Sequence, residues 1–353
     1  MLIPEDDFPL HQSAEPLSHV MAGHPNAYDR FWFNGYDESF FFALALGLYP
    51  NRGVIDAAFS VCDATSQHSV FASDTLVGRP TSVGPIRIEI VEPLRVNRII
   101  VDAPEQGLRA QLEYRQRFVT HEEPRQTMHD GPRLFMDVTR ATQLGTWSGW
   151  IESPLGRREI DAAFMGTKDR SWGVRPVGEP LPGAPSTRAP QLCFLWTPLN
   201  FEDRGVHYMT FDDEHGQALS RTGAILPLDG EGDIQRVSST LDVRLRKGTR
   251  WLERATLHLG EEDIALEPLL RFQMRGAGYA HPTFAHGTWH GGALLQGESL
   301  ELAEVPPLEY PNLHVQHVVR AVSSSGNGLG VLEVLMVGPY APAGLTGLFD
   351  GAP

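Results

Sequence analysis

The chain has 353 residues, of which 41% are hydrophobic and 21% charged, so it is long enough for two globular domains and is not a wholly disordered protein or a coiled coil. The 29 Lys and Arg residues against 44 Asp and Glu give a formal net charge of −15. Such a surface repels phosphate backbones and anionic lipid headgroups, so we expect no nucleic-acid partner.

The start of the chain is acidic and lacks the basic and apolar regions of an export signal. The most hydrophobic stretch, Phe40–Tyr49, is shorter than the ~20 residues that a membrane-spanning helix needs, so no integral membrane segment is expected. The two cysteines, Cys62 and Cys193, are far apart, which predicts neither a disulfide framework nor a thiolate zinc site. These features favour a cytoplasmic location; they leave the oligomeric state open.

The first distinctive segment, residues 28–42, contains eight aromatic residues and three acids. Aromatic side chains at this density would suit a large apolar ligand, and Trp32, Tyr36 and Asp37 are candidate substrate-binding residues. The alternative is ordinary packing of aromatic rings at alternating strand positions, with Asp37 at a turn or rim.

Alternating polar and apolar residues predict antiparallel strands in both halves of the chain. The clearest runs are 86–91, 94–101, 108–115, 240–246, 254–259 and 313–319. Gly and Pro residues at 50–53, 229–232 and 325–328 predict the turns between such strands, and the glycine-rich residues 326–330 are interpreted as a hairpin turn. The predicted fold class is all-β.

One proline-rich segment, Val177–Pro190, has four prolines and no apolar periodicity, so we interpret it as a linker. It separates a predicted N-terminal β domain, residues 1–176, from a predicted C-terminal β domain, residues 191–353. Each is the size of one closed β-barrel or sandwich.

The first cluster that suggests chemistry is Gly166–Arg175, at the end of the first predicted domain. Asp169 next to Arg170, with Trp172 close by, can form a proton donor at the edge of an apolar cavity, with the guanidinium orienting the acid. The alternative is a structural ion pair between Asp169 and Arg170, with Trp172 filling the interface between domains.

The second cluster is rich in histidine and lies at Gly278–Gly292, where Tyr279, His281, His286, Trp289 and His290 are candidate site residues. If the segment is extended, His286 and His290 lie on one face and line a shared cavity. Metal binding is the competing interpretation, but no third ligand stands at a diagnostic spacing, so we expect no bound metal. The remaining alternative is a set of hydrogen-bonded polar residues at the mouth of a barrel.

Several familiar nucleotide and hydrolase motifs are missing from the sequence. It contains no GxSxG, no GxxxxGK[ST], and no GxGxxG between a strand and a helix, which disfavours serine hydrolysis and nucleotide chemistry.

The order of these features resembles the tandem-lipocalin superfamily of carotenoid 1,2-hydratases. The resemblance rests on the aromatic first strand at 31–33, the signature Gly166-x-x-Asp169-x-x-Trp172-Gly173, the proline-rich linker and a second β domain. The sequence departs from the family at Arg170, where members often carry His. It also lacks an acid at 194–199, where the hydratases use a carboxylate.

The resemblance implies two lipocalin-like β domains in tandem and a lyase or isomerase that needs no cofactor. Such a hydratase, dehydratase or cyclase would protonate a C=C of an isoprenoid or steroid-like molecule and shield the resulting cation with aromatic rings. The assigned catalytic residues are Asp169, Tyr279, His281 and His286. The assigned substrate-binding residues are Trp32, Tyr36, Asp37, Arg170, Trp172, Trp289 and His290.

The alternative function is a non-catalytic carrier of a lipophilic small molecule in the same kind of barrel. The two functions differ in how many ionisable groups reach the pocket, because a carrier needs few.

Overall fold

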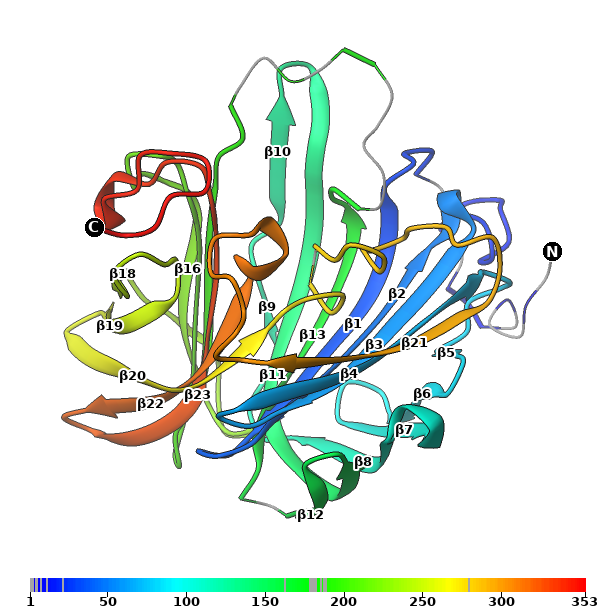
Figure 1. Ribbon diagram of the computed structural model, residues 1–353, viewed down its shortest axis with the longest axis horizontal. Helices are drawn as coiled ribbons and strands as arrows, with labels where there is room; N and C mark the ends of the chain where they lie inside the picture. Colours follow the sequence, from blue (N-terminus) through cyan, green and yellow to red (C-terminus); the bar gives the residue numbers. More distant parts are fainter. Residues whose placement is uncertain are drawn as a thin grey trace.

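The computed structural model describes residues 3, 6, 8–10, 12–20, 22–161, 163–177, 183, 184, 186, 189–278 and 280–353. These residues form two curled antiparallel sheets, and the predicted all-β fold class is confirmed (Figure 1). Short 3-10 turns connect some of the strands: η2 (Pro50–Arg52), η3 (Pro104–Gln106), η4 (Tyr310–Asn312) and η5 (Ala341–Ala343). None of the helical segments described is long and apolar enough to cross a membrane.

The first sheet has the order β21-β4-β3-β2-β1-β13-β11-β8-β7-β6-β5, with β9, β10 and β12 also paired to β11. Its strands are β1 (Ala27–Tyr36), β2 (Phe41–Tyr49), β3 (Val54–Cys62), β4 (Ser66–Thr75), β5 (Ser82–Val83), β6 (Ile86–Glu92), β7 (Val96–Ala103), β8 (Leu108–Gln116), β9 (His121–Glu122), β10 (Gln126–Asp130), β11 (Arg133–Ser153), β12 (Gly156–Ile160), β13 (Met165–Val174) and β21 (Leu294–Glu301).

The second sheet has the order β17-β16-β15-β14-β23-β22-β20-β19-β18. Its strands are β14 (Leu192–Asn200), β15 (Gly205–Asp212), β16 (Ala218–Leu226), β17 (Gln235–Arg236), β18 (Ser239–Leu245), β19 (Leu252–Leu259), β20 (Glu262–Gln273), β22 (Val315–Ser323) and β23 (Gly326–Val337). The glycine-rich residues 326–330 begin β23 and are not the turn that the sequence predicted.

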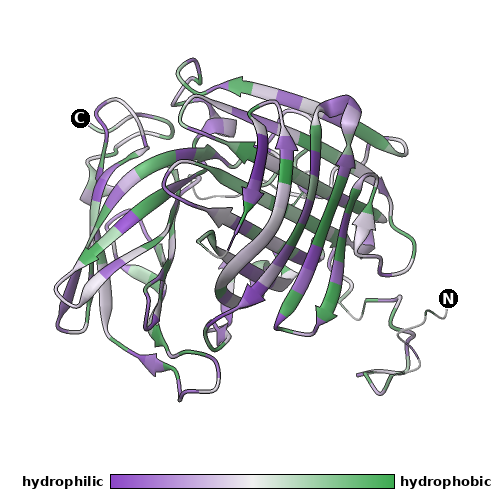
Figure 2. Ribbon diagram, turned by 90° about the horizontal axis from the view of Figure 1, so that it is seen from below, coloured by the Kyte–Doolittle hydropathy of each residue, from purple (hydrophilic) through white to green (hydrophobic). Residues whose placement is uncertain are grey.

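The six alternating runs coincide with β6, β7, β8, β18, β19 and β22, to within a few residues at each end. Figure 2 shows the alternation of hydrophobic and hydrophilic residues along many strands. One side of such a strand packs in a core while the other contacts solvent or polar groups. The local pattern of residues therefore predicts these strands well.

The division of the chain at 177–190 stays a prediction, because residues 178–182, 185, 187 and 188 lie outside the described part. One segment of the second half, β21, pairs with β4 and extends the first sheet, as Figure 1 shows. The second half of the chain therefore contributes one strand to the first sheet.

Strand β1 separates two hydrophobic cores. Phe31 and Phe33 belong to a core lined by residues of the first half only, whereas Trp32 and Tyr36 belong to a core that includes residues of both sheets. Side chains alternate across a strand, so each face of β1 serves one core. The face of β1 that carries Phe31 and Phe33 packs in the apolar core enclosed by the first sheet. The face that carries Trp32 and Tyr36 is directed toward the second sheet.

The structure explains why glycine stands at both ends of the Gly166–Gly173 signature. A Cβ at Gly166 would overlap Trp147 Nε1 and the carbonyl oxygen of Asn34. Gly173 has φ +129°, which side chains disfavour, and a Cβ there would overlap the carbonyl oxygen of Asp137. The signature therefore marks a crowded strand next to β1 and β11, independent of any chemistry.

Gly166→Ala is expected to lower the free energy of unfolding by about 1–3 kcal/mol, the range for inserting a methyl group into a packed core. The added methyl group would displace Trp147, whose Nε1 donates a hydrogen bond to the Asn34 carbonyl at 2.8 Å. Urea denaturation measures the change. Gly23→Ala is the control, because a Cβ at Gly23 has no atom within 4 Å. Equal stability of the two variants would contradict the packing argument.

Candidate functional site

A small pocket between the two sheets contains the predicted acid Asp169. Asp169 lies on β13 directly opposite Trp32 of β1, and both side chains face the second sheet. The cavity has a volume of about 30 Å³, enough for a water-sized group. Its lining residues are Arg30, Trp32, Arg140, Asp169, Arg175, Phe194, Trp196, Met274, His314 and Glu333.

The Asp169 carboxyl lies among aromatic and ionisable side chains, and Arg140 is the cation within ion-pair distance of it. Its Oδ2 lies 3.4 Å from Arg140 Nε, while its Oδ1 is buried and accepts no hydrogen bond from the described residues. Burial raises the pKa of Asp169 to about 6, although Arg140 acts in the opposite direction. A carboxyl with this pKa exchanges protons readily near neutral pH, as a general acid or base must.

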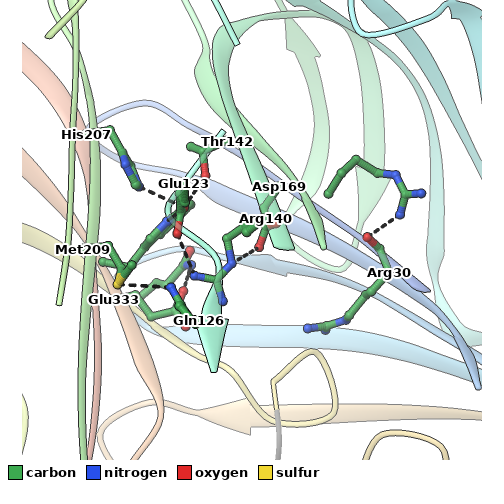
Figure 3. A network of polar contacts seen from close by, with 12 residues as sticks. Arg30, Glu123, Gln126, Arg140, Thr142, Asp169, His207, Met209 and Glu333 are labelled. Atoms are coloured by element: carbon green, nitrogen blue, oxygen red, sulfur yellow. Dashed lines mark hydrogen bonds and ion pairs between the residues drawn. The ribbon is translucent and has the colours of Figure 1, made fainter. Parts of the chain in front are cut away.

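Arg140 joins Asp169 to a second buried acid, Glu123, which directly follows β9 (Figure 3). Arg140 Nη1 donates to Glu123 Oε2 at 3.2 Å, and Thr142 Oγ1 and Trp196 Nε1 donate to Glu123 Oε1 at 2.8 and 3.2 Å. Burial opposes the charged form of Glu123, but the charge of Arg140 and the Thr142 hydrogen bond stabilise it, and the pKa of Glu123 is lowered. Glu123 is therefore an anion that holds Arg140 in place.

Two histidines adjoin Glu123 on the side away from the pocket. His207 Nε2 lies 3.4 Å from Glu123 Oε1, and the Nδ1 atoms of His207 and His121 are 3.1 Å apart. Burial lowers the pKa of His207 to about 3, so its ring is neutral at physiological pH. At that Nδ1–Nδ1 distance, one ring donates its proton to the other.

The opposite wall of the pocket contains a third acid, Glu333 of β23. His314 Nε2 and Gln316 Nε2 both lie 2.6 Å from its carboxylate oxygens. Asn34 Nδ2 donates to Gln316 Oε1 at 3.1 Å, and the Thr167 backbone donates to Asn34 Oδ1 at 2.9 Å. This chain of hydrogen bonds links β23 to β13 and sets the position of Glu333 relative to Asp169.

Two further arginines line the pocket at the end near the histidine-rich segment. Arg30 lies 5.9 Å from the Trp32 ring centroid and donates to the Ala277 carbonyl, which is also 3.3 Å from His286 Nε2. Arg175 lies 4.2 Å from the Tyr28 ring centroid. Burial and the positive charges of Arg30 and Arg175 lower the pKa of His286, so this ring is neutral beside the site.

Of the residues predicted from sequence, Asp169 and Trp32 share the pocket, and His286 adjoins it through Ala277. The predicted ion pair between Asp169 and Arg170 is wrong, because neighbouring residues of β13 point to opposite faces. Arg170 instead pairs with Asp29 at 2.6 Å and packs over the Phe31 ring. Trp172 also lies on that opposite face and is 44% exposed.

The other two candidates of the aromatic segment have structural contacts. The Tyr36 hydroxyl is fully buried and accepts a hydrogen bond from Asn200 Nδ2 at 3.0 Å. Asp37 accepts hydrogen bonds from the Ser39 and Phe40 backbones in the β1–β2 turn and pairs with Arg158. Asp37 is thus the turn residue of the alternative interpretation.

The histidine-rich segment is irregular and not the strand that would place His286 and His290 on one face. His281 Nδ1 accepts hydrogen bonds from the Thr283 and Phe284 backbones at 3.0 and 2.8 Å, so this ring stabilises a turn. The His290 ring packs on Phe284, and Trp289 is half exposed. Tyr279 lies outside the described residues.

Sequence reasoning missed Glu123, Arg140 and Glu333. The stretch 194–199 has no acid of its own, but β14 pairs with β23 so that Trp196 lies opposite Glu333. Carboxylates reach this stretch from β23 and from Glu123, at positions far away in the sequence. Among the described residues, no group of three or more His, Cys, Asp and Glu side chains is placed to hold a metal ion.

His207→Gln is expected to weaken the dependence of stability on acid pH. The folded protein keeps His207 neutral down to about pH 3, whereas the unfolded chain protonates it below pH ~6.5. The unfolded state thus binds more protons in this window, and stability falls as pH falls. Removing the ring should reduce the slope by about 1.4 kcal/mol per pH unit between pH 4 and 6. Urea denaturation across this range measures the slope.

The control for this prediction is the exposed His215→Gln, which should keep the wild-type slope. Wild-type pH dependence in the His207 variant would contradict the prediction.

Known proteins match this chain by fold over nearly its whole length. An AttH-like protein from Nitrosomonas europaea is 11% identical with a TM-score of 0.57, over 88% of this chain and 92% of that one. Kievitone hydratase from Nectria haematococca is 12% identical with a TM-score of 0.47, over 91% and 92%. No curated protein sequence matches.

The AttH-like structure supports the predicted tandem lipocalin-like fold and shows nothing about activity at this identity. The resemblance to carotenoid 1,2-hydratases has no support from a sequence match and stays a prediction. The profile of the Family of unknown function (DUF8625) matches residues 2–346, and the chain belongs to this family.

Proposed function

We propose that this protein is a cofactor-independent lyase or isomerase that acts by acid–base chemistry on a C=C of a hydrophobic small molecule. The observation that carries the proposal is the largely buried Asp169 carboxyl between Trp32 and the second sheet. Its pKa is about 6, and one of its oxygens accepts no hydrogen bond from the described residues. Such a group is set to give and take protons in a site with little solvent.

In the direction of hydration, water adds its oxygen to one carbon of the double bond, and the proton that this water loses passes to the Asp169 carboxylate. The Asp169 carboxyl then gives that proton to the other carbon of the former double bond. The carboxylate is thereby regenerated, and the product is the substrate plus one water. An isomerase would take a proton from one carbon with the Asp169 carboxylate and return it to a different carbon.

The charges around the pocket favour one class of double bond. Arg30, Arg140 and Arg175 place positive charge at the site, which opposes a carbocation and stabilises the developing negative oxygen of an enolate. A C=C conjugated to a carbonyl forms such an enolate, whereas an isolated alkene does not. The proposed substrate is therefore an α,β-unsaturated carbonyl compound, with an isoprenoid or steroid-like body against the aromatic walls.

The size of the pocket limits how the substrate binds. About 30 Å³ admits only a small group, so a whole substrate requires the lining side chains to move. Met274 lines the pocket and has an unbranched, flexible side chain that adapts to different shapes. We place the reacting end of the substrate in this pocket.

The composition of the lining argues for an enzyme over a carrier. Six of the ten lining residues carry ionisable side chains: Arg30, Arg140, Asp169, Arg175, His314 and Glu333. A carrier of a lipophilic molecule gains nothing from burying so many charges, each of which is costly to desolvate.

Isotope incorporation tests the proposal. The protein is incubated with a panel of hydrophobic enones and matched isolated alkenes in H₂¹⁸O or D₂O, and mass spectrometry detects new ¹⁸O or deuterium. We expect incorporation into an enone. A copurified lipophilic molecule, returned unchanged and bound tightly, together with no incorporation across the panel, would favour the carrier.

A further inference from the structure

A second cavity, larger than the Asp169 pocket and separate from it, has no assigned role. It has a volume of about 310 Å³, at the lower end of the ~300–1,000 Å³ typical of small-molecule sites. Its lining residues are Ala64, Arg246, Trp251, Pro268, Leu269, Leu270, Arg271, Leu302, Ala303 and His317. None of these residues lines the Asp169 pocket.

The two cavities lie on different faces of β22. Gln316 hydrogen-bonds Glu333 in the network beside Asp169, whereas the next residue, His317, lines the larger cavity. Consecutive side chains of a strand point to opposite faces. A ligand in the larger cavity therefore does not contact Asp169 through β22.

One end of this cavity is positively charged. Arg271 of β20 lies directly opposite His317 of β22, and its guanidinium packs 3.5 Å from the Trp251 ring centroid. Arg246 donates from Nε to the Leu252 carbonyl at 3.2 Å. In the described part of the chain, neither Arg246 nor Arg271 forms an ion pair with a carboxylate, although acidic residues outnumber basic ones in this protein.

Two buried polar atoms at this end, Arg271 Nε and His317 Nδ1, have no hydrogen-bond partner among the described residues, and His317 is only 2% exposed. Arg271 Nη2 donates to the Leu302 carbonyl at 2.6 Å. Burial and the neighbouring arginines lower the pKa of Arg271 to about 10 and that of His317 to about 3. A buried donor without a partner is costly, so an anion that reaches the Arg271 guanidinium gains a hydrogen bond that the empty cavity does not supply.

The rest of the lining is apolar. Leu269, Leu270, Leu302 and Pro268 form walls beside the charged end. We propose that this cavity binds an organic anion, with a carboxylate or phosphate head at Arg246 and Arg271 and an apolar body along the leucines. Guanidinium groups suit both heads, because each presents paired oxygens to the N–H donors.

Calorimetric titration of the whole protein with four probes tests this site: decanoate, decyl phosphate, decanol and inorganic phosphate. We expect one of the two amphiphilic anions to bind with 1:1 stoichiometry, and decanol and inorganic phosphate to bind at least tenfold more weakly. The tighter of decanoate and decyl phosphate identifies the head group. Equal affinity for decanol would overturn the anion site, and equal affinity for inorganic phosphate would overturn the role of the apolar walls.

Substitutions of the cavity arginines test whether the anion binds in this cavity. Arg246→Gln and Arg271→Gln should each weaken binding of the anion at least tenfold. Arg244→Gln should leave it unchanged, because Arg244 is an exposed residue of β18 that pairs with Glu253. Arg246 is exposed, so its variant is expected to fold even if the Arg271 variant does not. Wild-type affinity in a folded Arg246→Gln protein would overturn the proposal, whatever the activity at Asp169.

Discussion

Asp169→Asn is expected to reduce turnover of the proposed reaction by about 10²–10⁴-fold, the usual contribution of a general acid or base. Asn keeps the size of the side chain but cannot transfer a proton, and Arg140 retains Glu123 as its partner. Turnover by isotope incorporation and the melting temperature are measured on the same preparation. Wild-type turnover should also fall as pH falls through about 6, because the Asp169 carboxylate gains a proton there and can no longer take one from water or from the substrate.

The matched control is Asp102→Asn, an exposed acid on β7 paired with Arg109. This variant should keep wild-type turnover. If the Asp169 variant melts early but keeps wild-type activity per folded molecule, Asp169 serves only the structure, and the proposed chemistry loses its acid.

Arg140→Gln is expected to lower the free energy of unfolding by about 3–5 kcal/mol, because it leaves buried carboxylates without their counter-charge. Glu123 has a fully buried side chain, and its Oε2 lies 3.2 Å from Arg140 Nη1. Urea denaturation at pH 7 measures the loss. Arg125→Gln, which removes a surface ion pair with Asp137, should leave the free energy of unfolding close to that of the wild type.

A double-mutant cycle separates loss of the ion pair from loss of packing. If the buried charge of Glu123 causes the destabilisation, Glu123→Gln together with Arg140→Gln should be less destabilised than the sum of the single variants. Additive effects would show that Arg140 contributes packing alone.

The two candidate clusters singled out in the sequence differ in their local structure. The signature around Asp169 lies on a regular strand, β13. Because consecutive side chains of a strand point to opposite faces, Asp169 and Arg170 lie on different faces of the sheet. The histidine-rich segment contains Pro282 and the positive-φ residues Gly287, Gly291 and Gly292, which interrupt an extended chain. Its spacing argument failed because the assumed strand does not form.

The sequence by itself determined the all-β class and the positions of β6, β7, β8, β18, β19 and β22, and it singled out Asp169 and Trp32. These depend on local patterns, because the period of two is imposed by the geometry of a single strand. Only the tertiary structure decided that Arg140, Glu123 and Glu333 surround Asp169 and Trp32. Strand register and sheet order bring these residues together across long separations in sequence, and burial between two sheets then shifts their pKa values, which no local pattern encodes.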